Sequence, residues 1–285
     1  MKTNEVVIVN FGAFGDIINS TPLAKHYSLE GNKIYFVTRK RYSDVLKENE
    51  FIDKIYCFQE KVNMNNVSMT INSKRKIEKL FSGKKIIYSA PYMSPKYDGT
   101  PRSNLLSIIK EECSQVQEWL CDFVPVIRLT EEQEYEARNF FSCIPKRKTI
   151  LIEYEYFSAQ SFLNFSHIEK SLDNIKEQVN VIFTGKNFPK EMSKLQQKFS
   201  SHNFYHYSGS FKSNAALYNM CDLFVGCSSG ITCLTSSDYC LEAETKRIEC
   251  CRGEHWSSKE WKHNADRKII CYSYEEFLEG FLNYV

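Results

Sequence analysis

The chain has 285 residues, and its 37 lysines and arginines nearly balance its 35 aspartates and glutamates, for a formal net charge of +2. Hydrophobic residues make up 42% and charged residues 25%, a composition typical of globular proteins and unlike that of disordered or fibrous chains. The balanced charge disfavours a dedicated nucleic-acid binder, and no run approaches the ~18 uncharged apolar residues of a membrane span.

The chain begins with a short apolar run, 6–9, which is far shorter than a secretory h-region, so we expect a cytoplasmic protein. Similar runs then alternate with helical patterns, which predicts a parallel α/β architecture. The first series of predicted strands is 6–9, 34–37, 55–58, 86–88 and 124–129, and the second is 149–152, 179–184, 223–225, 248–250 and 269–271.

Between the two series lies Ile144-Pro145-Lys146-Arg147-Lys148, which we interpret as a linker. The chain is therefore predicted to hold two Rossmann-like domains, 1–145 and 146–285. Residues 90–102 are rich in proline and predict a loop at the carboxyl end of a strand, where open α/β sheets bind ligands. Apolar residues at helical spacing predict an amphipathic helix within 105–120 and a closing helix over 274–285. The segment Ser166–Glu169 matches a capping box and predicts a helix start.

Eleven cysteines raise the question of disulfides or a metal site. The number is odd and no two cysteines have Cys-x-x-Cys spacing, so we expect mostly buried, reduced thiols. His202 and His206 could share a helix face, but no acidic or thiol ligand stands close to them in the sequence. We therefore predict no metal site.

The most informative stretch is the turn after the first strand. Glycines at 12 and 15 permit a tight turn and a close backbone approach to a ligand. Asp16 opens the following helix, and its simplest interpretation is an N-cap. The spacing is not the Gly-x-Gly-x-x-Gly fingerprint, so dinucleotide binding is disfavoured.

A second strand ends in a turn of small residues, Gly226 to Thr232, that opens another helix. Free backbone N–H groups at such a start favour a diphosphate, although an ordinary capped turn has the same pattern. The stretch Val181–Gly185 is typical of a strand and turn near a nucleotide base, but by itself it is weak evidence.

At these residues the sequence resembles the bacterial heptosyltransferases of glycosyltransferase family 9. The resemblance rests on Gly12-Ala13-Phe14-Gly15-Asp16, on Thr21-Pro22, and on Phe51–Ile55, which is similar to the family's segment leading into the third strand. It implies the GT-B fold, two Rossmann-like domains with mostly parallel sheets facing across a cleft, with a last helix that can cross back to the first domain. It also implies inverting sugar transfer from a nucleotide donor, with Asp16 as the catalytic base and Gly12, Ala13 and Gly15 shaping the acceptor-side turn.

The resemblance assigns donor binding to the second domain. The residues so assigned are Thr184, Gly185, Ser228, Ser229, Gly230, Ile231 and Thr232. The sequence departs from the family pattern in three places: Ser228 stands where an acid is expected, Cys233 where a histidine is expected, and residues 158–165 hold no lysine. Phe162 or Phe165 can replace the family's tryptophan in packing. Charge compensation for the donor phosphates would then come from Lys186, Arg247 or Arg252, or from hydroxyls and backbone dipoles.

No Asp-x-Asp occurs, which argues against metal-chelating transferases. We therefore expect no cofactor, with a nucleotide sugar as substrate, ADP-linked sugars among the candidates. The expected acceptor is a glycan or glycolipid of lipopolysaccharide, capsule or a related structure. The basic runs 39–41 and 74–76 are either solvated surface or contacts to an anionic acceptor, with peripheral contact at the inner membrane.

Two other functions fit the same sequence. One is a nucleotide-sugar epimerase or hydrolase on the same fold. The other is a non-catalytic GT-B-like binding subunit, which the three departures from the family pattern favour. The aromatic patch around Trp256 and Trp261 is either a sugar platform or a packed surface loop.

Overall fold

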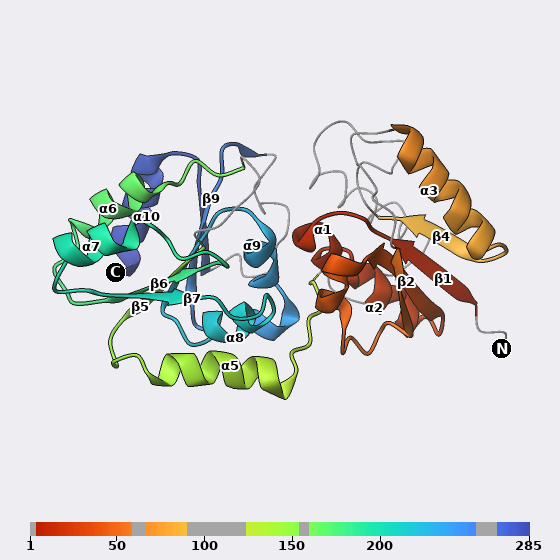
Figure 1. Ribbon diagram of the computed structural model, residues 1–285, viewed down its shortest axis with the longest axis horizontal. Coiled ribbons are helices and arrows are strands. Elements are labelled where there is room, and N and C mark those ends of the chain that lie inside the picture. The colour runs from red at the N-terminus through yellow and green to blue at the C-terminus, as the bar shows by residue number, and fades with distance from the viewer. Residues whose placement is uncertain (1–3, 59–66, 90–123, 154–159, 255–266) are drawn as a thin grey trace. The chain divides into compact units, whose positions relative to one another are not determined.

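The computed structural model of the chain describes residues 4–58, 67–89, 124–153, 160–254 and 267–285. The described residues form two parallel β-sheets with helices, and the chain divides into two compact units, Met1–Arg128 and Leu129–Val285 (Figure 1). The α/β class predicted from the sequence is confirmed. We predicted a boundary after residue 145, but the two units divide after Arg128. The boundary lies earlier because helix α5 (Glu131–Ser142) packs against helix α8 (Ser213–Tyr218) of the second unit.

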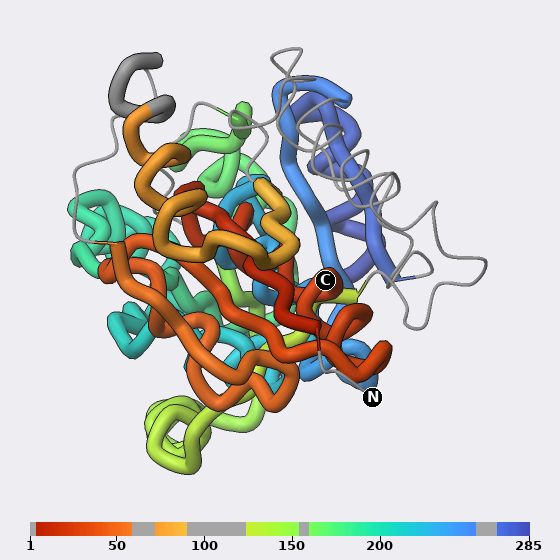
Figure 2. Tube along the Cα trace, turned by 90° about the vertical axis from the view of Figure 1, so that its right-hand side faces the viewer, coloured from red at the N-terminus to blue at the C-terminus, as the bar shows by residue number. Residues whose placement is uncertain are grey.

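The first unit is built on a four-stranded parallel sheet in the order β3-β2-β1-β4. Val7 and Val9 of β1 pack with Ile77 of α3, while α2 contacts β1 and β2 (Figure 1; Figure 2). The elements are β1 (Glu5–Val9), α1 (Phe14–Ile18), α2 (Thr21–Leu29), β2 (Lys33–Arg39), the 3₁₀ helix η1 (Lys40–Leu46), β3 (Lys54–Phe58), α3 (Val67–Leu80) and β4 (Lys85–Tyr88).

The predicted strand 124–129 is wrong, since residues 124–130 form no strand. Val126 and Ile127 are nevertheless fully buried. Side chains replace the missing strand partner: the amide of Val126 donates to Thr21 Oγ1 at 2.7 Å, and its carbonyl accepts from Asn49 Nδ2 at 3.3 Å. The apolar run 124–129 is therefore buried, but it does not pair with a sheet.

The second unit is built on a six-stranded parallel sheet in the order β10-β9-β8-β5-β6-β7. Its strands are β5 (Thr149–Glu153), β6 (Asn180–Thr184), β7 (Asn203–Tyr207), β8 (Leu223–Gly226), β9 (Lys246–Cys250) and β10 (Lys268–Cys271). Its other elements are α6 (Phe165–Leu172), α7 (Met192–Lys198), α9 (Gly230–Leu234), the 3₁₀ helix η3 (Asp238–Cys240) and α10 (Tyr274–Tyr284).

Strand β7 has no counterpart among the predicted strands. Its sequence, Asn-Phe-Tyr-His-Tyr, mixes polar and aromatic residues, as expected for a strand at the edge of a sheet. His206 therefore lies on a strand and shares no helix face with His202. No group of three or more metal-ligating side chains occurs within the described residues.

The ends of two helices also refine the predictions. Helix α6 begins at Phe165 with Asn164 as its N-cap, whose side chain accepts from the amide of His167 at 3.1 Å, so the predicted cap at Ser166 is wrong. The closing helix α10 packs against β9, β10 and α6, with Phe277 and Phe281 in the core of the second unit. The predicted loop 90–102, the amphipathic segment 105–120 and the aromatic patch near Trp256 lie outside the described residues.

Each sheet has one point where the strand order reverses direction. In the first unit the chain runs from β1 outward to β2 and β3 and places β4 on the other side of β1. In the second unit it runs from β5 to β6 and β7 and places β8 on the other side of β5. Parallel sheets bind ligands outside the carboxyl ends of the strands at such switch points. The two positions to inspect are therefore the ends of β1 and β4, and the ends of β5 and β8.

Nine cysteines lie in the described part of the chain, and all are free thiols. Seven of the nine are buried, which agrees with the expectation that most of these cysteines act as small apolar residues. None of the helices in the described residues is long and apolar enough to cross a membrane.

Candidate functional site

The switch point of the first unit is organised by Asn10, which follows β1 and is fully buried. Its Oδ1 accepts from the amide of Gly12 at 2.8 Å. Its Nδ2 donates to the carbonyl of Asp16 at 3.0 Å and to Ser20 Oγ at 2.7 Å, and lies 3.4 Å from Ser89 Oγ at the end of β4. One amide side chain thus ties the turn to the following helix and to the neighbouring strand.

Asp16 lies on this turn, half-buried, in the first turn of α1. The N-cap of α1 is Ala13 and Asp16 is the third residue of the helix, so the prediction that Asp16 is the N-cap is wrong. Its Oδ2 nevertheless accepts from the amide of Ala13 at 2.9 Å and so satisfies a backbone N–H at the start of the helix. Gly12 makes the arrangement sterically possible, because a Cβ at this position would lie 2.3 Å from Asp16 Oδ2. Gly15 lies within α1 and its carbonyl accepts from the amide of Asn19 at 2.9 Å. The structure therefore brings the four predicted acceptor-side residues together.

Cationic and aromatic side chains surround the same turn. Arg39 Nη2 donates to the carbonyl of Gly12 at 3.1 Å. The ring of Tyr42 lies 4.8 Å from the guanidinium carbon of Arg39, 4.4 Å from that of Arg41, and 4.8 Å from the ring centroid of Phe14. Arg39 and Arg41 of the basic run 39–41 therefore make cation–π contacts with Tyr42, and Arg39 also binds the turn at the Gly12 carbonyl.

In the second unit, the turn between β8 and α9 holds most of the predicted donor-binding residues. Gly226 ends β8, and a Cβ there would lie 2.5 Å from Thr232 Oγ1. Ser228 is buried and has a φ of 57°, a left-handed conformation that is uncommon outside glycine. Ser229 and Gly230 are half-buried, whereas Ile231 and Thr232 are buried. Backbone strain in a turn at a switch point is typical of a functional site.

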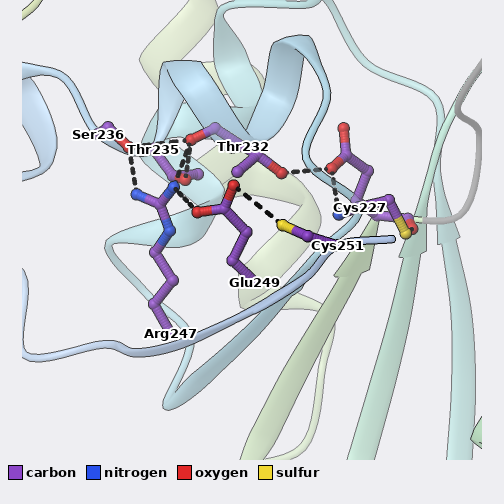
Figure 3. A network of polar contacts seen from close by, with 8 residues as sticks. Cys227, Thr232, Thr235, Ser236, Arg247, Glu249 and Cys251 are labelled. Atoms are coloured by element: carbon purple, nitrogen blue, oxygen red, sulfur yellow. Dashed lines mark hydrogen bonds and ion pairs between the residues drawn. The ribbon is translucent and has the colours of Figure 1, made fainter. Parts of the chain in front are cut away.

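The turn is built around Glu153, the last residue of β5, which sequence analysis missed. Its side chain is 1% exposed. Oε2 accepts from the amide of Cys227 at 2.8 Å and from Thr232 Oγ1 at 2.7 Å, and Oε1 accepts from Ser229 Oγ. Cys227 and Thr232, which donate to this carboxylate, are labelled in Figure 3. Burial raises the pKa of Glu153, while hydrogen bonds from Ser229 and from backbone amides oppose that rise.

A buried ion pair lies on the other side of Thr232 (Figure 3). Arg247 Nη2 donates to the carbonyl of Thr232 at 2.9 Å and lies 3.6 Å from Glu249 Oε2, and Arg247 Nη1 donates to Ser236 Oγ. Both side chains are at most 1% exposed. Arg247 was one of three candidates to compensate the negative charge of the donor phosphates. Its position corrects that expectation, because its guanidinium group is bonded to side chains and backbone in the interior of the unit.

The other two candidates differ from Arg247. Arg252 Nε donates to the carbonyl of Ser161 at 2.9 Å, and its amide donates to the carbonyl of Gln160 at 2.8 Å. Lys186 is exposed in the segment after β6. Phe162 and Phe165, the two candidates for the tryptophan's packing role, both pack against the core of the unit, and the Phe165 ring stacks on Phe183 with centroids 5.2 Å apart.

Thr184 and Gly185 lie at the same edge of the sheet as Glu153. Thr184 is the register partner of Glu153 on the neighbouring strand, and its Oγ1 donates to Asn214 Oδ1. The carbonyl of Gly185 lies 2.9 Å from His206 Nε2, and its amide donates to the carbonyl of Tyr207. These two predicted residues are therefore near the turn, with the Thr184 side chain bonded within the protein.

Two residues that organise the sites, Asn10 and Glu153, were not predicted. Both stand directly where an apolar central strand ends, as the first polar side chain after Val9 and after Ile152. Comparing the first strand of each half would have placed them at equivalent positions. Each lies one residue beyond the pair that its strand forms with the neighbour across the switch point, Val9 with Tyr88 and Ile152 with Val225.

A scan against protein-family models finds no match, and neither does a search of curated protein sequences. Solved structures do match. The chain is similar to a family 9 glycosyltransferase from Veillonella parvula, with 14% identity and a TM-score of 0.62 over 100% of this chain and 93% of that one. It is similar to the E. coli heptosyltransferase WaaC with ADP-2-deoxy-2-fluoro heptose, with 9% identity and a TM-score of 0.55 over 98% of both chains.

A third similar structure is a candidate UDP-N-acetylglucosamine 2-epimerase from Listeria monocytogenes, with 9% identity and a TM-score of 0.54 over 99% of this chain and 88% of that one. At such identities the similarity establishes the fold. The two sheets of parallel strands match those of GT-B glycosyltransferases, so the fold implied by the resemblance is confirmed.

Proposed function

We propose that the chain is an inverting glycosyltransferase that moves a sugar from a nucleotide-sugar donor to a hydroxyl of a cell-surface glycan, such as lipopolysaccharide or capsule. The observation that carries the proposal is the placement of Asp16. Its carboxylate is half-buried at the switch point of a parallel sheet, on a turn that Asn10 holds by hydrogen bonds to the Gly12 amide and the Asp16 carbonyl. The similar structures include a family 9 glycosyltransferase and a heptosyltransferase with an ADP-linked sugar, which supports this class of reaction and donor.

In the proposed mechanism, Asp16 acts as the general base. The acceptor hydroxyl attacks C1 of the donor sugar from the face opposite the nucleotide diphosphate, so the new C1–O bond forms as the bond to the phosphate breaks and the configuration inverts. The hydroxyl proton passes to the Asp16 carboxylate. A positioned base of this kind contributes roughly 10²–10⁴-fold to the rate.

Donor binding is assigned to the second unit in this proposal. Thr184, Gly185 and the turn Ser228–Thr232 lie at one sheet edge, next to the switch point of β5 and β8. We propose no metal or other cofactor, because the chain has no Asp-x-Asp sequence. The acceptor is a glycan or glycolipid, and the enzyme works in the cytoplasm, at the inner membrane surface where such acceptors are anchored.

The test is the variant Asp16→Asn. An asparagine can still accept from the Ala13 amide, so folding and donor affinity are expected to change little while sugar transfer falls by about 10²-fold or more. Transfer is measured with a panel of ADP-, UDP-, GDP- and CMP-sugars and a lipopolysaccharide-type acceptor. The matched control is Asp44→Asn, which removes an exposed ion pair with Lys47 in the same unit. Transfer that survives in Asp16→Asn would overturn the assignment of the base.

A second function, nucleotide-sugar epimerisation or hydrolysis, is favoured by the candidate 2-epimerase with the same fold. Incubation of each nucleotide sugar without acceptor separates the two reactions, because an epimerase or hydrolase releases an epimer or free sugar. A chain that binds none of the nucleotide sugars would instead be the non-catalytic subunit.

A further inference from the structure

Arg252 is an exposed cation at the carboxyl edge of the second sheet, beyond the last residue of β9, Cys250. Strand β9 lies next to β8, and the register pairs Gly226 with Glu249, so the chain leaves β9 beside the end of β8. Ligands of parallel sheets bind outside this edge. The position of Arg252 therefore puts a positive charge where the sheet would bind a ligand.

The backbone around Arg252 is held on two sides. The amide of Cys251 donates to the carbonyl of Cys271 at 2.9 Å, and the amide of Arg252 donates to the carbonyl of Gln160 at 2.8 Å. Cys251 and Ser161, the residue after Gln160, are both fully buried. The side chain of Arg252 therefore extends from a backbone that is fixed relative to the sheet.

The guanidinium group of Arg252 is itself oriented by a hydrogen bond. Its Nε donates to the carbonyl of Ser161 at 2.9 Å. Ser161 Oγ accepts from the amide of Leu163 at 3.2 Å, and Leu163 belongs to the core of the unit, so this carbonyl lies on a well-packed segment. Because the N–H groups of a guanidinium lie in one plane, a bond at Nε sets that plane and leaves the Nη1 and Nη2 groups as a pair of donors.

The Nη groups of Arg252 differ from those of other arginines in this unit. Arg247 is buried and bonded to Ser236, to the carbonyl of Thr232 and to Glu249, and Arg138 pairs with Glu134 on the surface of α5. Within the described residues, Arg252 makes its hydrogen bonds to two carbonyls through its amide and Nε, and forms no ion pair. Its paired donors are therefore oriented and open to an anion.

We propose that Arg252 is the residue that binds the phosphates of the donor, by a bidentate contact from its two Nη groups to phosphate oxygens. This inference rests on the proposed function, because it takes the ligand to be a nucleotide sugar. Gln160 and Ser161 are positioning residues, which act through their carbonyls on the amide and Nε of Arg252. When the bond from C1 to the diphosphate breaks, its electron pair stays on the diphosphate oxygen, and Arg252 offsets part of that added charge.

Two features favour Arg252 over Lys186, the other exposed cation expected to compensate the phosphates. The Ser161 side chain lies within hydrogen-bonding reach of the Cys227 thiol, so the segment that orients Arg252 is in contact with the residue that follows β8 at the switch point. A guanidinium also binds two phosphate oxygens at once, whereas a lysine ammonium acts as a point charge.

The experiment measures ligand binding by the wild type and by Arg252→Gln. The probes are ADP, UDP and GDP, each compared with its nucleoside and with its glucose or mannose derivative, so that members of a series share a base and differ in phosphate and sugar. Titration calorimetry gives each Kd, and thermal unfolding shows that each variant is folded. The matched control is Arg138→Gln, which removes the exposed arginine that pairs with Glu134 at 3.0 Å in the same unit.

Arg252→Gln is expected to bind the diphosphate and the nucleotide sugar of the best series about 10- to 100-fold more weakly than the wild type, with a change of no more than about twofold for the nucleoside. Arg252→Lys keeps the charge but loses the paired donors and the Nε bond, so we expect an intermediate loss. The affinity of Arg252→Gln for the diphosphate should also depend less on salt, because a charge contact is missing. Arg138→Gln should bind as the wild type does.

Equal diphosphate affinity in the wild type and Arg252→Gln, or an equal loss for the nucleoside and its diphosphate, would overturn the inference and leave the proposed function standing. A larger loss of diphosphate affinity in Lys186→Gln than in Arg252→Gln would also overturn it. Failure of the wild type to bind any probe would count against both proposals. If Arg252→Gln does not fold, Arg252→Lys decides the matter, since full diphosphate affinity in that variant contradicts a bidentate contact.

Discussion

The two switch points solve the same geometrical problem with opposite chemistry. In each unit, the first polar residue at the end of the central strand forms side-chain hydrogen bonds to the glycine-containing turn that follows at the sheet edge. Asn10 both donates and accepts, so it binds the Gly12 amide and the Asp16 carbonyl at once. Glu153 only accepts when ionised, so it collects the amide and hydroxyl donors of its turn.

This difference has consequences for what each turn presents to a ligand. In the first turn, which Asn10 binds, the carboxyl group is that of Asp16, which is half-buried at the edge of the turn. The carboxyl group of the second turn, on Glu153, lies in the interior. The two turns therefore differ in where their carboxyl group lies, at the edge of the first turn and in the interior beside the second.

The largest effect is expected from exchanging the chemistry of the first turn. Asn10→Asp places a buried carboxylate against the Asp16 carbonyl and removes the donor that bound it. Loss of that hydrogen bond and burial of an unpaired charge should lower the free energy of unfolding by about 3 kcal/mol or more. Denaturant unfolding measures the change, with the exposed Asn139→Asp of α5 as a control expected within about 0.5 kcal/mol. A change as small as that of the control would show that Asn10 does not organise the turn.

The second prediction concerns the glycine that makes room for Asp16. In Gly12→Ala the new Cβ would lie 2.3 Å from Asp16 Oδ2, so the carboxylate must move. A displacement of about 1 Å in a catalytic group can lower the rate by about 10²-fold, and we expect such a loss in kcat/KM for sugar transfer. Gly280→Ala is the matched control, because its Cβ would lie 3.4 Å or more from its nearest neighbours, atoms of Ile269 and Ile248. Full activity in Gly12→Ala would mean that the position of Asp16 is unimportant for catalysis.

The fold could be predicted largely from the sequence because parallel strands buried on both faces give continuous apolar runs. Nine such runs became strands in the structure. The errors occur where an apolar segment forms no strand, or where a strand is not apolar. Residues around Val126 are apolar but bind to side chains, and β7 is an edge strand whose polar residues hid it.

The candidate sites were predictable in part, for a physical reason. Gly12 and Asp16 stand close in sequence and belong to one turn, so a local motif was enough to find them. Glu153 contacts Cys227 and Thr232 across more than 70 residues, and only the pairing of β5 with β8 brings them together. Arg247 looked like a free cation in the sequence, but its ion pair with Glu249 depends on burial that composition does not show.

The third prediction compares how the free energy of unfolding depends on pH in the wild type and in the variant Glu153→Gln. Burial raises the pKa of Glu153 in the folded state, so folding favours its protonated form. The stability contributed by that proton is complete below the ordinary carboxyl pKa and is lost as pH rises through the raised value. Glu153→Gln should therefore match the wild type at low pH and be more stable near pH 7, with slopes that differ by at most about 1.4 kcal/mol per pH unit. Thermal or denaturant unfolding across this range measures the difference, and parallel curves would contradict it.

The smallest effect is expected at the strained backbone of the second turn. Ser228 and Glu48 are the described non-glycine residues with positive φ, at 57° and 65°. Glycine at either position relieves the strain but adds freedom to the unfolded chain, so each variant should gain between zero and about 1 kcal/mol in the free energy of unfolding. The two variants should differ in donor affinity, because Ser228 belongs to the proposed donor site and Glu48 lies in an exposed position of the first unit. Weaker nucleotide-sugar binding by Ser228→Gly alone would connect the strain at 228 to the ligand, whereas equal binding by both variants would show that the conformation serves only to place the donors that Glu153 accepts.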